Sequence, residues 1–113
     1  MVLDILKIIV AAGTAVTGLY ALLRPTAVYG FTGLAAPGPR GVTEIRAVLG
    51  GAFIGLGVVT LILRDPAAYQ TLGAMYLAIA AARLGAIFLD RSSVRSNWIS
   101  LAVEVVFGVI LVV

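Results

Sequence analysis

The chain has 113 residues, of which 62% are hydrophobic and only 12% are charged, and its formal net charge is +3. A soluble domain carries about twice that share of charged residues, so the composition excludes an ordinary water-soluble globule or a disordered tail. The absence of Cys and His excludes a disulfide scaffold, thiol or imidazole catalysis and the usual haem ligands. We expect a membrane protein without a metal or cofactor, and no motif indicates an enzyme.

Four apolar runs of about twenty residues predict four membrane-spanning helices. In chain order they cover about residues 3–23, 44–63, 68–89 and 97–113. The last three are joined by short turns, which make consecutive helices antiparallel neighbours. We therefore expect one all-α domain, a membrane-spanning antiparallel four-helix bundle, with a single long loop over residues 24–43.

The ends of the helices follow from local signals. Arg24-Pro25 ends the first run, and the stretch from Pro37 to Gly41 cannot continue a helix. Thr43 is the predicted N-cap of the second helix, with an acidic residue after it to complement the helix dipole. The apolar part of the first run is longer than the hydrophobic region of a usual signal peptide, and its start holds Asp4 as well as Lys7, so we expect a retained anchor.

Lys and Arg are divided unevenly between the two ends of the predicted bundle. One end carries the arginines at positions 24, 40, 46, 91 and 95, and the other carries only Lys7 and Arg64. The richer end is expected to be cytoplasmic. We therefore expect the first and third loops inside and both termini outside. Because the basic residues are scattered singly, we expect no nucleic-acid partner.

Each predicted helix carries one stripe of polar or small residues, which we expect to face the other helices. The stripes are Gly13, Thr17, Tyr20 and Arg24; Glu44, Ala47, Gly51 and Gly55; Tyr69, Tyr76, Arg83 and Asp90; and Asn97, Ser100, Glu104 and Gly108. The small residues Gly51, Gly55, Ala74, Ala78 and Ala82 are expected to serve close helix packing.

Arg83 and Glu104 lie at equal depth in the third and fourth helices, about 10 Å below one membrane face. A lone charge in mid-span costs about 2.5 to 3.5 kcal/mol, so we predict a salt bridge inside the bundle. Such a pair fixes helix register, carries a proton at Glu104, or forms a site for an anionic or polar head group. In the last case Tyr20 and Tyr76 are expected to line the pocket.

The predicted polar cluster extends to the start of the second helix. Glu44 shares the small-residue stripe and is expected to point inward. Arg46 lies about 200° away on the wheel, so it either reaches a lipid phosphate or a neighbouring protein, or bends toward Glu104. The predicted site residues are Glu44, Arg46, Tyr76, Arg83, Glu104 and Tyr20, with Asp90, Asn97 and Ser100 as a second set.

The same residues resemble those of a bacterial family of four-helix membrane proteins that is catalogued only as a domain of unknown function. The resemblance rests on Gly18-Leu19-Tyr20-Ala21-Leu22 before Arg24-Pro25, on the segment from Glu44 to Gly51, on Arg83-Leu84 with Asp90, and on Glu104. It implies that Glu44, Arg46, Arg83, Asp90 and Glu104 form a polar signature, and it brings no activity. This chain carries Arg91 where the family usually has a glycine.

Two functions from different classes fit these features. The first is a structural or accessory subunit of a larger membrane complex, because the chain has almost no mass outside the membrane. The second is a binder or transporter of a lipid or a small anionic or polar molecule at Arg83 and Glu104. The expected partners are membrane lipids together with other membrane subunits or a second copy of the chain.

Overall fold

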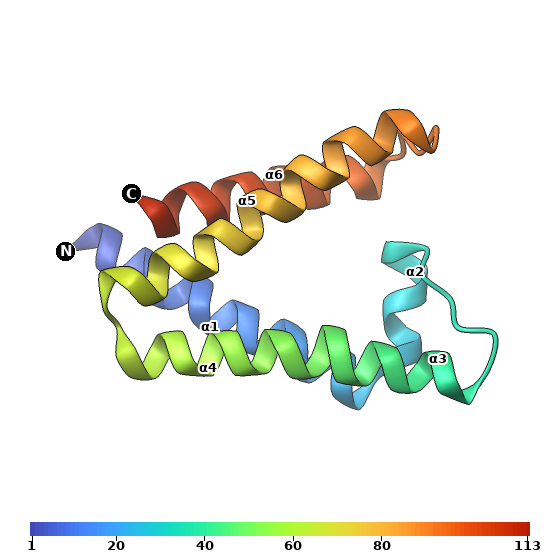
Figure 1. The fold of residues 1–113 in the computed structure, drawn as a ribbon, viewed down its shortest axis with the longest axis horizontal. Helices are drawn as coiled ribbons and strands as arrows, with labels where there is room; N and C mark the ends of the chain where they lie inside the picture. The colour runs from blue at the N-terminus through green and yellow to red at the C-terminus, as the bar shows by residue number, and fades with distance from the viewer.

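The computed structural model describes all 113 residues, and it is entirely helical. Four helices are long and apolar enough to cross a membrane: α1 (Val2–Leu23), the continuous helix Pro39–Leu63, α5 (Pro66–Leu89) and α6 (Arg95–Val112). The second of these consists of α3 (Pro39–Glu44), a π-helical segment η2 (Ile45–Ala52) and α4 (Phe53–Leu63). The prediction of an all-α four-helix membrane protein is confirmed (Figure 1).

The second helix begins five residues earlier than predicted. Pro39 is its first residue and Gly38, in an extended conformation, precedes it. A proline is favoured at this position because its missing N–H would have no partner there and its fixed φ suits a helix. The Thr43 hydroxyl donates to the Pro39 carbonyl (3.1 Å), so Thr43 lies inside the helix and the N-cap prediction was wrong. By contrast, Asp65 caps α5 by accepting from the Ala68 N–H (2.8 Å).

The long loop contains helical structure of its own. After Arg24 a 3-10 turn η1 (Pro25–Val28) leads into the short helix α2 (Tyr29–Thr32). Gly33 ends α2 with φ of 71°, a conformation that suits glycine because it has no Cβ. In Figure 1, η1 and α2 turn back from the end of α1 toward α5 and α6.

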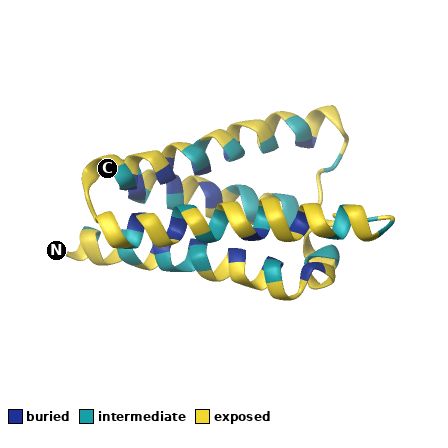
Figure 2. Ribbon diagram, turned by 60° about the horizontal axis from the view of Figure 1, so that its bottom comes forward, coloured by how far each residue is buried: buried dark blue, intermediate teal, exposed yellow.

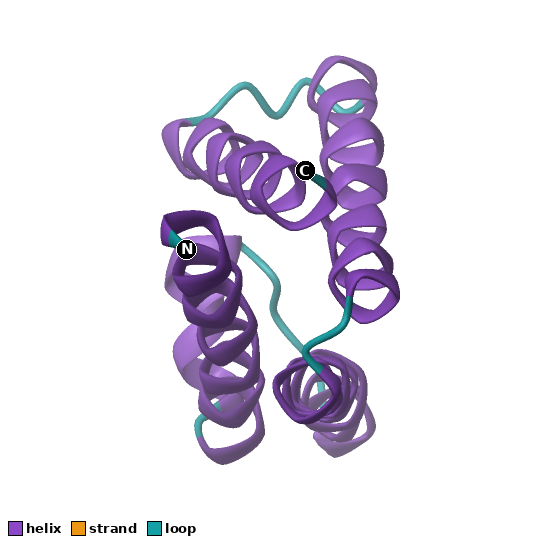
Figure 3. Ribbon diagram, turned by 90° about the vertical axis from the view of Figure 1, so that its left-hand side faces the viewer, coloured by secondary structure: helices purple, strands orange, loops and turns teal.

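The four helices form two close pairs. α1 packs along η2 and α4, while α5 packs along α6 (Figure 3). The termini and the α4–α5 turn lie at one end of the molecule, and the first and third loops lie at the other (Figure 1). The two pairs converge at the terminal end and diverge toward the loop end, where α2 lies between them.

Glycines allow the backbones within each pair to approach closely. A Cβ on Gly18 of α1 would lie 2.6 Å from the Gly50 carbonyl oxygen, and one on Gly57 would lie 2.6 Å from the Ala15 nitrogen. In the other pair, a Cβ on Gly73 would lie 3.1 Å from the Gly108 carbonyl oxygen. Small residues at helix contacts in membranes serve this purpose.

The π-helical segment changes which face of the second helix turns inward. Ile45 and Gly50 are five residues apart and both are buried, as the wider π-helical turn requires. Gly51 and Gly55 consequently face outward, and a Cβ on either would have no neighbour within 4 Å. The predicted inward stripe on this helix was therefore wrong, because the prediction assumed a regular α-helix.

Other stripes also differ from the prediction. The inner face of α1 consists of Val10, Ala11, Thr14, Gly18 and Ala21. The observed inner face is displaced by one residue from the predicted stripe. Thr17 and Tyr20 of that stripe lie at the edge of the observed face. On α5 the small residues Ala74, Ala78 and Ala82 are exposed, so they do not serve packing within the chain.

The buried core lies at the closed, terminal end of the bundle. It consists of Val10, Ala11, Tyr69, Leu72, Tyr76 and Leu111. Only 19 of 113 residues are buried, and large apolar side chains cover the outside (Figure 2). Such an exterior suits hydrocarbon and not water.

Candidate functional site

The central feature of the bundle is an ion pair between α5 and α6. Arg83 Nε donates to both carboxylate oxygens of Glu104, at 2.6 Å to Oε1 and 3.0 Å to Oε2. The Glu104 side chain is 9% exposed and that of Arg83 is 31% exposed. The predicted salt bridge is confirmed. It forms because an unpaired charge at this depth is costly in hydrocarbon.

Asn97 holds the guanidinium from the loop side. Its Oδ1 accepts from Arg83 Nη1 (3.0 Å), and its Nδ2 donates to the Ser92 carbonyl (2.9 Å). The arginine is thus tied through Asn97 to the turn between α5 and α6. Of the second predicted set, only Asn97 contacts the pair directly.

The ion pair borders a cavity of about 230 Å³ to which every spanning helix contributes. Its wall consists of Thr17, Tyr20, Ala21, Val28, Thr32, Leu49, Phe53, Tyr76, Ile79, Arg83 and Glu104. The four residues that the sequence suggested for a pocket, Tyr20, Tyr76, Arg83 and Glu104, therefore line one cavity. Arg83 and Glu104 are its only charged residues.

Tyr76 ends the polar part of the cavity toward the core. Its hydroxyl lies 2.5 Å from the Thr14 hydroxyl. Thr14 already donates its single hydroxyl proton to the Val10 carbonyl (2.8 Å), so Tyr76 must be the donor in the contact between the two hydroxyls. The Tyr76 ring also packs edge-on against Phe107, with 5.5 Å between ring centroids. Nothing singled out Thr14 in the sequence except that it is a hydroxyl in an apolar helix.

The short helix α2 covers the loop end of the cavity. Val28 and Thr32 contribute to the wall, and α2 contacts α6. The Thr32 hydroxyl donates to the Val28 carbonyl (2.6 Å) and accepts from the Leu34 N–H (3.0 Å). These bonds satisfy its polar atoms within the loop, so Thr32 offers no free donor to the cavity.

Arg83 also borders a second, more polar cavity of about 400 Å³ at the turn between α5 and α6. Asp90, Ser92 and Asn97 line this second cavity beside it. Asp90 has no ion-pair partner in the chain. The arginine thus lies between the central cavity and a polar recess near the membrane surface.

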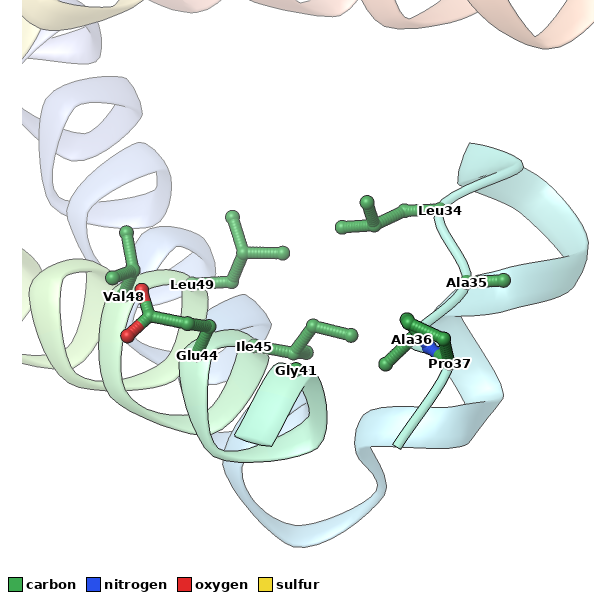
Figure 4. Close-up of a pocket in the computed structure, with 9 residues that line it drawn as sticks. All are labelled: Leu34, Ala35, Ala36, Pro37, Gly41, Glu44, Ile45, Val48 and Leu49. Atoms are coloured by element: carbon green, nitrogen blue, oxygen red, sulfur yellow. The ribbon is translucent and has the colours of Figure 1, made fainter. Parts of the chain in front are cut away.

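Glu44 does not join the ion pair of Arg83 and Glu104. It is exposed and pairs with Arg40 (2.5 Å), one helical turn earlier. It lines a separate, mainly apolar pocket of about 370 Å³ under the long loop. In Figure 4, Leu34 points from the loop toward the side of η2 that carries Leu49.

Arg46 does not bend toward Glu104. Its Nη1 donates to the Leu22 carbonyl (2.6 Å) in the last turn of α1. The final carbonyls of a helix have no partner within the helix and carry partial negative charge, so a cation is stabilised there. Arg46 therefore joins the second helix to the end of the first and lies away from Glu104.

Arg91 lies in the turn after α5, at a position whose backbone conformation favours glycine. Arg91 has φ of 53°, in the left-handed region that favours glycine. Ser100, the remaining residue of the second predicted set, is half-buried on α6 and does not line the central cavity.

The sequence matches, over residues 2–113, the family described as domain of unknown function (DUF4345). No curated protein and no solved structure matches the chain.

Proposed function

Since the chain belongs to the DUF4345 family, to which no function is assigned, we propose a role from its own site: it binds the polar group of a lipid or a small molecule inside the membrane. The observation that carries this proposal is that Tyr20, Tyr76, Arg83 and Glu104 border one cavity of about 230 Å³. A pair that served only to fix helix register would need no space beside it. The exposed third of the Arg83 side chain supports a binding role.

The test is to extract the protein in a mild detergent, size it and identify bound small molecules by mass spectrometry. If the proposal is correct, the wild-type protein should co-purify with a stoichiometric amphiphile, and the double variant Arg83→Leu/Glu104→Leu should lack it. The matched control is Asp4→Asn/Arg64→Gln, which removes one acidic and one basic side chain, both exposed, at the terminal end of the bundle. If the wild type carries no small molecule, or if both double variants retain it equally, the proposal fails.

The second candidate is an accessory subunit of a larger membrane complex or a homo-oligomer. It is favoured by the small residues that face outward, namely Gly51, Gly55, Ala74, Ala78 and Ala82. Helices with such faces approach other helices closely. Sizing of the extracted protein distinguishes the two: a stoichiometric protein partner that is released by Gly51→Leu and not by Ala102→Leu, on the exposed side of α6, supports the subunit role.

The proposed location is a bacterial inner membrane, with the first and third loops cytoplasmic and both termini outside. The uneven arginine content of the two ends supports this orientation. Because the chain has no cysteine, single substitutions can be labelled cleanly. Ser93→Cys in the third loop is expected to react with an impermeant thiol reagent only from the cytoplasmic side, and Ala67→Cys at the α4–α5 turn only from outside.

A further inference from the structure

Among the residues that line the central cavity, Arg83 and Tyr20 are the two with unused polar hydrogens. Arg83 Nε and Nη1 are used on Glu104 and Asn97, whereas Nη2 has no hydrogen-bond partner in the chain. The Tyr20 hydroxyl has none either, and Tyr20 is 51% exposed. The hydroxyl protons of the other lining groups are already donated: Thr17 donates to Gly13, Thr32 to Val28, and Tyr76 to Thr14. An occupant that accepts hydrogen bonds would therefore complement the site.

The charge at the site is already balanced. Arg83 and Glu104 are the only charged residues in the cavity wall, and they neutralise each other. A bound anion would bring a net charge of −1 into the membrane interior, which is costly at this depth. A bound cation would bring a net charge of +1 into the same interior, and both carboxylate oxygens of Glu104 already accept from Arg83 Nε. An uncharged acceptor leaves the site neutral.

The size of the cavity limits how much of a molecule it can take. Its volume of about 230 Å³ is below the range of about 300 Å³ and upward that encloses a drug-sized ligand. The apolar pocket of about 370 Å³ beside it shares Leu49 with its wall. A compact polar head at Arg83 thus has apolar surface next to it for a hydrocarbon chain.

We infer that the occupant is an uncharged single-chain amphiphile whose head is a carbonyl oxygen, bound by Arg83 Nη2 and the Tyr20 hydroxyl. An acyl ester and a ring ketone of the quinone type both offer this chemistry. The inference rests on the proposed function, and it adds that the head group is neutral. Glu104 acts as the residue that sets this preference, because it cancels the charge of the arginine that makes the contact.

The experiment places the protein in nanodiscs of ether-linked phospholipid, which has no ester carbonyl of its own. Four probes with chains of the same length are compared: methyl dodecanoate, dodecanesulfonate as a permanent anion, dodecyltrimethylammonium and dodecane. A decyl-substituted benzoquinone is the fifth probe and distinguishes a ring ketone from an acyl ester. Occupancy is measured by native mass spectrometry, and the infrared carbonyl band reports hydrogen bonding of the head group.

The wild type is expected to bind a carbonyl probe about tenfold more tightly than dodecane or dodecyltrimethylammonium, since a hydrogen bond to a charged group contributes that much. Dodecanesulfonate also accepts hydrogen bonds, but it is expected to bind more weakly than the carbonyl probes because its charge is uncompensated in the membrane interior. Its carbonyl band should shift to lower frequency on binding. In Glu104→Gln the site becomes cationic, and preference should change to dodecanesulfonate. Tyr20→Phe should weaken carbonyl binding while leaving the preference for a neutral head.

Tighter wild-type binding of dodecanesulfonate than of both carbonyl probes overturns the neutral-head inference and leaves the proposed function standing. Equal binding of all probes, dodecane included, or no binding at all overturns both. The wild-type comparison decides the inference even if Glu104→Gln fails to accumulate. A Glu104→Gln protein that folds and keeps the wild-type preference also contradicts the inference.

Discussion

The hydroxyl of Tyr76 on α5 donates to the hydroxyl of Thr14 on α1 across 2.5 Å. This is the only side-chain hydrogen bond that joins the two helix pairs at the closed end of the bundle. The same two side chains consequently form the polar end of the cavity and hold the two helix pairs together.

Tyr76→Phe is therefore expected to destabilise the fold by about 0.6 kcal/mol and by no more than about 1.7 kcal/mol, the average and the maximum measured for hydrogen bonds between membrane helices. The measurement is unfolding of the detergent-solubilised protein in a double-mutant cycle with Thr14→Val. The two substitutions should be strongly non-additive. The matched control is Thr17→Val, because the Thr17 hydroxyl bonds only within its own helix; equal coupling of Thr17 and Thr14 to Tyr76 would contradict this role.

Breaking the ion pair on one side should cost more than removing it. Arg83→Leu leaves Glu104 unpaired within the membrane and is expected to cost about 3 kcal/mol or to prevent accumulation. Arg83→Leu/Glu104→Leu should recover most of that loss, since no charge remains buried. The readout is membrane yield and thermal unfolding, with Arg40→Leu as the exposed control of less than about 1 kcal/mol. A double variant as unstable as the single one would be the opposite result.

Replacing glycine by alanine should lower stability at a glycine in a helix contact, such as Gly18, and should not lower it at an outward glycine, such as Gly51. Gly18→Ala places a methyl group 2.6 Å from the backbone of the second helix, and we expect a loss of about 1 to 3 kcal/mol. Gly51→Ala meets nothing within 4 Å, so stability should be unchanged or raised by up to about 1 kcal/mol. Thermal unfolding of both variants in the same detergent tests the assignment of the two faces.

Arg91→Gly should raise stability by about 0.5 to 1 kcal/mol, because glycine adopts a positive φ without the steric cost that a side chain brings. Arg64 also has a positive φ, of 49°, but its Nε donates to the Leu61 carbonyl (2.9 Å). Arg64→Gly loses that hydrogen bond, so its stability should rise by less than that of Arg91→Gly. If melting shows a larger gain for Arg64→Gly, backbone conformation is not what limits the Arg91 turn.

The number of spans and the Arg83–Glu104 pair could be predicted because each follows from a strong local constraint. Twenty apolar residues have few alternatives to crossing a membrane, and two opposite charges at one depth have few alternatives to pairing. The shared cavity of Tyr20 and Tyr76 also agrees with their depth along the helices.

The inward face of the second helix could not be read from the sequence. A π-helical segment shifts the register, and nothing in the run from Ile45 to Ala52 distinguishes it from a regular helix. The partners of Glu44 and Arg46 depend on that register and on where the helix begins. Because it begins at Pro39, Glu44 lies within reach of Arg40, and Arg46 reaches the end of α1.

The unequal lengths of the last two helices have a consequence for the surrounding bilayer. α6 has 18 residues and α5 has 24, so they are about 27 Å and 36 Å long. Both cross the same hydrocarbon layer, and tilting is one way in which the longer helix can fit it. Because α5 carries Arg83, its tilt sets the distance between Arg83 and the α1–α4 pair. A thinner bilayer requires more tilt, so bilayer thickness would set the width of the space beside the ion pair.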